Sequence, residues 1–193
     1  MNAITQIITQ QLGGTAARTL AQRLGISEST ANTAVQIGVP LILAALARNA
    51  SQPQEAQNLH QAVATDHDGS ILDNISGYLQ NPQQANGSGI LGHVFGTQRP
   101  VVENNLAQAT GMDQGSAAGL LETLAPLVMC SLGKAQHENG LDASGLSNLL
   151  TNQQQEAQAN APDGMSFLSS MLDQNNDGSS IDDLKRLAAG FFK

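Results

Sequence analysis

Apolar residues recur at the spacing of an α-helix along nearly the whole chain. The first two apolar stripes consist of Ile4, Ile7, Ile8 and Leu12, and then of Ala17, Leu20, Ala21 and Leu24. Residues spaced by three and four positions share one face of a helix, which is the face that a folded protein buries. We find no convincing segment that alternates apolar and polar residues as a β-strand does. The pattern therefore predicts an all-α fold.

Local signals mark where these helices begin and end. Gly25 follows the second stripe and is expected to end its helix, because glycine adopts the left-handed conformation at that position. Ser27 is expected to cap the next helix with its hydroxyl group. Pro40 lies inside the third apolar stripe, so we expect a kink or a break near Val39.

The same signals recur at an offset of 86 residues (111 minus 25). The matched pairs are Gly25 and Gly111, Ser27 and Asp113, and Pro40 and Pro126. The apolar stripes between these positions match as well, without a gap. A repeat of this length predicts an internal duplication, in which two homologous multi-helix halves follow each other along the chain.

The repeat divides the chain into segments. Residues 1–80 form the first helical repeat, residues 81–89 (NPQQANGSG) the linker, and residues 90–193 the second repeat. The second repeat contains a polar insertion near residues 151–164 (TNQQQEAQANAPDG), for which we expect a loop or partial order. Because the apolar faces of one half are insufficient alone, we expect the halves to pack into one helical domain with one continuous core.

Composition specifies what this core contains. Apolar residues make up 40% of the chain, but aromatic residues only 3%, with no Trp and one Tyr. The core must therefore consist of Leu, Ile, Val and Ala, which suit close packing between helices. Leu43 and Leu124 are predicted core residues, so a charge at either position should unfold the chain. Glu122 is expected on the solvated edge of the same helix as Leu124.

Charge excludes two classes of partner. The net charge is −8, with only 8 Lys and Arg residues, so the chain lacks the basic surface that binds nucleic acid or anionic lipid. The first residues, Met1–Ile4, include no basic region of a signal peptide. The apolar stretch Ala34–Ala47 is shorter than the roughly 20 residues of a spanning helix. We therefore predict a cytoplasmic protein without membrane insertion.

One segment has the spacing of a DNA-binding helix-turn-helix. Residues 19–31 combine a helix, a glycine turn and a serine-capped second helix. However, the second helix carries one acidic residue and no Lys or Arg between Glu28 and Ala47. Its counterpart in the second repeat, Asp113–Gly133, has no Lys or Arg at all. We therefore interpret both segments as corners between packed helices, and DNA binding is the less favoured alternative.

A loop near the C-terminus matches the first half of a calcium loop. Asp173, Asn175 and Asp177 alternate and precede a glycine, which would direct three oxygen ligands inward. The usual bidentate glutamate at loop position 12 is replaced by Leu184, but Asp183 could close a shortened loop. The sequence thus gives a calcium site formed by Asp173, Asn175, Asp177 and Asp183 as one hypothesis.

The first repeat carries a poorer version of this loop. It retains Asp66, Asp68 and Asp73, but Ala64 replaces the first aspartate. A turn followed by a capping box, Ser70-x-x-Asp73, explains this loop without a metal, and the same explanation applies to the second loop. Both interpretations of the loops stay open.

The remaining reactive residues give no catalytic pattern. Cys130 lies in an apolar run, so we expect it to be buried. His60, His67, His93 and His137 are scattered, and no two have the spacing of a helical metal site. No serine, cysteine or lysine lies in a recognisable nucleophile motif. We predict that the protein is not an enzyme and requires no organic cofactor.

Several segments together resemble a known family. They are Leu24–Ser27 (LGIS), Pro40–Leu46 (PLILAAL), Gly89–Gly96 (GILGHVFG) and Leu124–Met129 (LAPLVM), with the two Asp-Gly turns. This combination resembles the bacterial DUF937 and YidB-like group of uncharacterised proteins along essentially the whole chain. The resemblance implies an all-helical fold and a bacterial source, but no established activity or site.

These observations favour a non-enzymatic protein-interaction or scaffolding module. Its partner would be a protein of unknown identity, and a homo-oligomer is a further expectation. The alternative is a calcium-binding module that uses residues 173–183.

Overall fold

The computed structural model describes residues 3–160 of the 193-residue chain, and every regular element within that range is a helix. The elements are α1 (Ala3–Gln11), α2 (Thr15–Leu24), α3 (Glu28–Asn49), α4 (Pro53–Asp66), α5 (Ser70–Asp73), α6 (Ile75–Gln80), the 3₁₀ helix η1 (Pro82–Ala85), α7 (Gly87–Phe95), the 3₁₀ helix η2 (Gly96–Gln98), α8 (Arg99–Thr110), α9 (Gln114–Asn139) and α10 (Ala143–Asn160). The all-α prediction is confirmed for this part of the chain.

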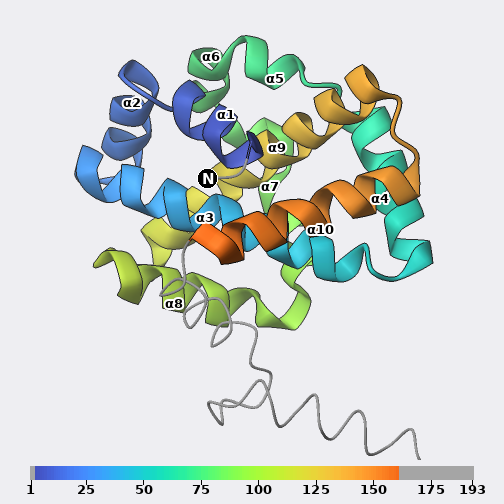
Figure 1. The fold of residues 1–193 in the computed structure, drawn as a ribbon. Helices are drawn as coiled ribbons and strands as arrows, with labels where there is room; N and C mark the ends of the chain where they lie inside the picture. Colours follow the sequence, from blue (N-terminus) through green and yellow to red (C-terminus); the bar gives the residue numbers. More distant parts are fainter. Residues whose placement is uncertain (1–2, 161–193) are drawn as a thin grey trace, which may run out of the picture. The chain divides into compact units, whose positions relative to one another are not determined.

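Helices α3 and α9 lie at the centre, and the shorter helices surround them (Figure 1). The two helices approach closely because Gly38 faces Leu124; a Cβ atom at Gly38 would lie 2.9 Å from Leu124 Cδ1. Leu43 and Leu124 are 1% and 0% exposed, as predicted for core residues. Residues 3–157 lie in one compact unit, so both segments of the predicted repeat contribute to a common core.

The predicted helix ends around Gly25 and Gly111 are confirmed. Both glycines adopt left-handed conformations, with φ of 67° and 72°, directly after α2 and α8. The side chains of Ser27 and Asp113 each accept a hydrogen bond of 3.0 Å from a backbone N–H three residues later. These are the bonds of helix N-caps, and they start α3 and α9 at corresponding positions.

Of the two alternatives expected near Val39, a kink or a break, the break does not occur. Helix α3 continues through Pro40, and α9 continues through Pro126. A proline inside a helix costs about 3 kcal/mol, because it removes one backbone hydrogen bond. Both helices are buried along most of their length, and packing against the surrounding helices offsets this cost.

The central helices also have the length and apolar composition of membrane spans. Glu28–Asn49 and Gln114–Asn139 both meet this criterion. In each case most of the apolar window, 67% and 72% respectively, is buried inside the protein. Core helices of soluble proteins meet the same criterion, so this property is weak support for a membrane location.

Two segments differ from the predicted loops. Within the expected linker 81–89, residues 82–85 form η1 and α7 begins at Gly87. Within the expected polar insertion 151–164, residues 151–160 are the second half of α10, and the rest lies outside the described residues. The residues of this half, mostly Gln, Ala, Asn and Glu, include strong helix formers. The side chains of Leu150 and Gln153 are buried and attach this half of α10 to the core, so the polar composition of the segment wrongly predicted a loop.

Candidate functional site

A cleft of about 530 Å³ opens between α2, η1, α7 and α9. Its walls include Arg23 and Leu24 from α2, Pro82 and Gln83 from η1, Asn86 and Ser88 at the start of α7, and Glu122 and Thr123 from α9. The volume lies within the range of about 300–1,000 Å³ that is typical of ligand pockets. Polar groups from four elements thus converge on one hollow.

The shape of the cleft depends on the close approach of α7 to α9. A Cβ atom at Gly87 would lie 1.9 Å from the carbonyl oxygen of Glu122, so only glycine fits at this contact. The preceding residue, Asn86, has φ of 52° and is the one non-glycine residue with positive φ in the described range. Asparagine tolerates this conformation better than most residues, which lets the chain turn sharply from η1 into α7.

The side chains of Arg23 and Tyr78 hold α6 against α2 and α9 beside the cleft. The Nη1 atom of Arg23 donates to the carbonyl oxygens of Leu79 and Gln80, both at 3.2 Å, at the end of α6. The hydroxyl of Tyr78 donates to the carbonyl oxygen of Thr123 at 2.7 Å. Burial raises the pKa of Tyr78 above the ordinary value of a tyrosine. The end of α6 is thereby tied to α2 and α9.

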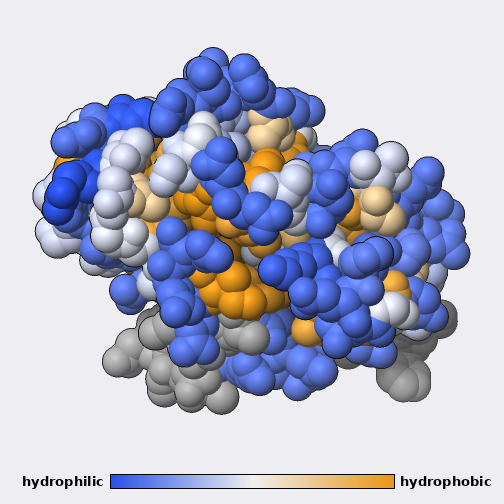
Figure 2. Space-filling model, turned by 90° about the horizontal axis from the view of Figure 1, so that it is seen from above, coloured by the Kyte–Doolittle hydropathy of each residue, from blue (hydrophilic) through white to orange (hydrophobic). Residues whose placement is uncertain are grey.

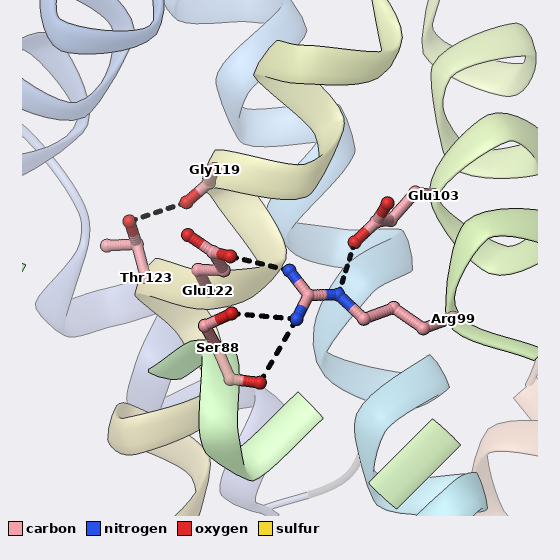
Figure 3. A network of polar contacts seen from close by, with 6 residues as sticks. All are labelled: Ser88, Arg99, Glu103, Gly119, Glu122 and Thr123. Carbon is pink, nitrogen blue, oxygen red and sulfur yellow. Dashed lines mark hydrogen bonds and ion pairs between the residues drawn. The ribbon is translucent and has the colours of Figure 1, made fainter. Parts of the chain in front are cut away.

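Arg99 joins three helices beside the cleft (Figure 3). Its Nε donates to Glu103 Oε1 at 2.6 Å, and its Nη2 donates to Glu122 Oε1 at 2.5 Å. Its Nη1 donates to the carbonyl and hydroxyl oxygens of Ser88 at 3.1 and 2.8 Å. The hydrogen bond to Glu103, together with the bond and charge of Glu122, raises the pKa of Arg99. Glu122 is therefore an ion-paired residue at the cleft wall, with 36% of its side chain exposed.

The groups around the cleft are suited to binding. Among the lining residues, Arg23 and Glu122 are the titratable ones, and Glu122 is engaged by Arg99. The hydroxyl of Thr123 donates to the carbonyl oxygen of Gly119 at 2.7 Å (Figure 3). The lining therefore presents a cation, amides and hydroxyls, but no nucleophile hydrogen-bonded to a base.

Comparison with known protein families shows to which family the chain belongs. The model of a family described as "Bacterial protein of unknown function (DUF937)" matches residues 6–135, which is 130 of 193 residues (135 minus 6, plus 1). The chain belongs to the DUF937 family. The matched range contains every residue that lines the cleft, from Arg23 to Thr123. No curated protein and no solved structure matches the chain. The narrower YidB-like assignment stays a prediction.

The structure of this DUF937 protein places Cys130 and His67 together, which the sequence analysis missed because 63 positions separate them. Cys130 is 1% exposed, as predicted, and its Sγ lies 4.0 Å from His67 Nδ1. Burial raises the pKa of the thiol and lowers the pKa of the imidazole. Both groups are therefore neutral at neutral pH, and the thiol is a poor nucleophile.

The other histidines remain apart from one another. His60 Nε2 lies 3.2 Å from the carbonyl oxygen of Leu141, and His93 Nε2 lies 3.3 Å from Glu55 Oε2. Within residues 3–160, no three side chains of His, Cys, Asp or Glu form a group that could hold a metal.

The acidic loop of the first repeat is a hydrogen-bonded turn. Asp68 Oδ1 accepts a bond of 2.9 Å from the backbone N–H of Ser70, and this bond lowers the pKa of Asp68. Gly69, with φ of 97°, is the N-cap of α5, and no side chain caps this helix, so the predicted capping box of Ser70 and Asp73 does not form. The backbone N–H of Ser70, which that box would have paired with Asp73, is bonded to Asp68 instead. The second loop, with Asp173, Asn175, Asp177 and Asp183, lies outside the described residues.

The segment that resembles a helix-turn-helix, residues 19–31, forms the corner between α2 and α3. Helix α3 packs against α9 as one of the two central helices, so most of its surface is buried. At its exposed start, Glu28 is paired with Arg18 Nε at 2.8 Å. This arrangement favours a structural corner over a helix that enters a DNA groove.

Proposed function

We propose that this DUF937 protein is a non-enzymatic interaction module, and that its cleft binds a segment of a protein partner. The cleft itself is the observation that carries the proposal. Gln83 and Asn86 offer amide groups that can pair with a peptide backbone, and Leu24 and Pro82 offer apolar contacts. The chain's net charge of −8 supports a protein partner over nucleic acid.

The surface adds support for an interaction role. Figure 2 shows apolar side chains gathered in the middle of one face, with polar side chains around them. Apolar surface with a polar rim is a frequent property of protein interaction sites. We extend the proposal to a scaffolding role in the cytoplasm, in which the protein could also pair with a second copy of itself.

The proposal predicts that filling the cleft abolishes partner binding. Gln83 lines this cleft, whereas its neighbour Gln84 lines a separate shallow hollow on the other side of η1. Both side chains are exposed, so Gln83→Trp and Gln84→Trp should leave the urea midpoint unchanged. In affinity capture from the source cells, the wild type and Gln84→Trp should retain the same proteins and Gln83→Trp should lose them. Equal capture by both variants would contradict the proposal.

We also propose that the fold arose by internal duplication. Four helices of the first part have counterparts in the second, shifted by about 86 residues: α1 and α7, α2 and α8, α3 and α9, and α4 and α10. The matched glycine ends, side-chain caps and internal prolines support this proposal. A duplicated unit explains why α3 and α9 occupy equivalent central positions.

Calcium binding by Asp173, Asn175, Asp177 and Asp183 stays a separate proposal, which rests on the sequence pattern alone. It predicts heat release in a calorimetric calcium titration and shifts of the Asp177 amide resonance in NMR spectra. Substitution of Asp177 by Asn should weaken the binding, whereas Asp68→Asn in the first loop should not. A titration without heat or shifts at millimolar calcium would remove the proposal.

A further inference from the structure

We propose that Arg23 makes the cleft a carboxylate-binding site, and that its ligand is a carboxylate-bearing peptide segment of the partner. This inference rests on the proposed function, because it specifies what the same cleft recognises. It goes further by naming the group in the ligand and the side chain that holds it.

The first argument is the state of the positive charges. Arg18 is paired with Glu28, Arg99 with Glu103 and Glu122, and Lys134 Nζ lies 4.0 Å from Glu138. Among the described residues, Arg23 and Arg48 form no such ion pair, and of these two Arg23 is the one that lines the cleft, where it donates to two backbone carbonyl groups. Its charge is therefore oriented by the protein without being neutralised by one of these carboxylates. An unneutralised guanidinium at a cleft attracts an anionic group.

The second argument is the geometry of the guanidinium group. Arginine has five N–H donors, and the two protons of Nη1 serve the carbonyl groups of Leu79 and Gln80. These bonds fix the plane of the group and leave the donors of Nε and Nη2. That edge can form two parallel hydrogen bonds to one carboxylate, which is the arrangement that arginine favours. A fixed donor group also loses little conformational freedom when the ligand binds.

The third argument concerns what surrounds the carboxylate. Gln83 and Asn86 provide amide donors and acceptors, and Leu24 and Pro82 provide apolar contacts next to Arg23. A peptide supplies matching backbone amides and side chains, whereas a small inorganic anion would leave most of this lining unused. The net charge of −8 repels free anions at long range, so selectivity must come from these short-range contacts.

The test is an NMR titration of the full-length protein with three probes: N-acetyl-tetraalanine with a free carboxylate, the same peptide as its C-terminal amide, and acetate. The free-acid peptide should shift the amide resonances of Asn86 and Ser88 and the side-chain signal of Arg23. The C-terminal amide should bind at least about tenfold more weakly, because a charge-assisted hydrogen bond is lost. Equal binding of both peptides would overturn the proposal. Acetate that binds as tightly as the peptide would overturn the peptide assignment in favour of a small carboxylic acid.

Two arginine variants with the same change in net charge locate the site. Arg23→Gln should weaken binding of the free-acid peptide at least about tenfold. Arg48→Gln, at an exposed position near the end of α3, should leave it within a factor of two. Equal weakening by both variants would indicate a general charge effect and overturn the assignment of Arg23.

The Trp variants protect the test from a folding artefact. If Arg23→Gln loosens the end of α6 and lowers the urea midpoint, Gln83→Trp provides the same comparison with Arg23 intact. It should block the free-acid peptide, and Gln84→Trp should not. A partner that depends on Gln83 but is retained in full by a folded Arg23→Gln variant would overturn this inference and leave the proposed function standing.

Discussion

Replacement of Leu124 by aspartate is expected to unfold the protein at neutral pH. Leu124 is 0% exposed and faces Gly38 where α3 and α9 meet. The substitution loses about 2 kcal/mol of apolar burial and places an unpaired carboxylate in the core, which costs several kcal/mol more. The sum is comparable with the 5–15 kcal/mol that stabilise a typical domain. Leu43→Asp, at 1% exposure in α3, should have the same effect. Circular dichroism during urea unfolding measures both.

The matched control is Val101→Asp in α8. It introduces the same charge in place of an apolar residue, but Val101 is 48% exposed and the carboxylate stays in water. Its urea midpoint should equal that of the wild type, because exposed substitutions usually change stability by less than about 0.5 kcal/mol. A wild-type midpoint for both Leu43→Asp and Leu124→Asp would show that α3 and α9 do not form the common core.

Local features of the fold could be predicted because their causes are local. Gly25 and Gly111 end helices through their own backbone conformations, and Ser27 and Asp113 cap helices three residues away. Burial of Cys130 followed from its apolar neighbours in sequence. Each of these signals lies within one turn of the position that it specifies, so no tertiary information was needed.

The cleft could not be predicted because its contacts join distant segments. Tyr78 reaches Thr123 across 45 positions, and Gly87 meets the backbone of Glu122. In the sequence, Gly87 belongs to a glycine-rich stretch that is typical of a linker, and it becomes significant only where α9 lies against it. Arg99 likewise gives no local signal of its contact with Glu122, 23 positions later. The sequence therefore predicted the helices but missed the residues that shape the hollow between them.

The second large loss of stability is expected for the substitution Gly133→Ala in α9. A Cβ atom at Gly133 would lie 1.8 Å from the carbonyl oxygen of His67 and 2.9 Å from that of Val63. Both obstacles are backbone atoms at the end of α4, so they cannot move aside as a flexible side chain would. Relief requires α9 and α4 to separate, and we expect a loss of about 3 kcal/mol, as for severe overpacking of a core. The change in urea midpoint at constant slope measures this loss.

Gly92→Ala in α7 separates this steric effect from helix propensity. No neighbouring atom lies within 4 Å of a Cβ atom at Gly92, and its φ is not positive. Alanine should therefore stabilise this variant by roughly 0.5–1 kcal/mol, since it restricts the unfolded chain more than glycine does. Alanine at Gly133 restricts the unfolded chain in the same way and so brings the same gain in stability. If Gly133→Ala is nevertheless destabilised, the cost of the clash with α4 is larger than that gain. If both variants gain stability equally, α9 and α4 do not pack as closely as the structure shows. Opposite signs would identify Gly133 as the residue that lets the two helices meet.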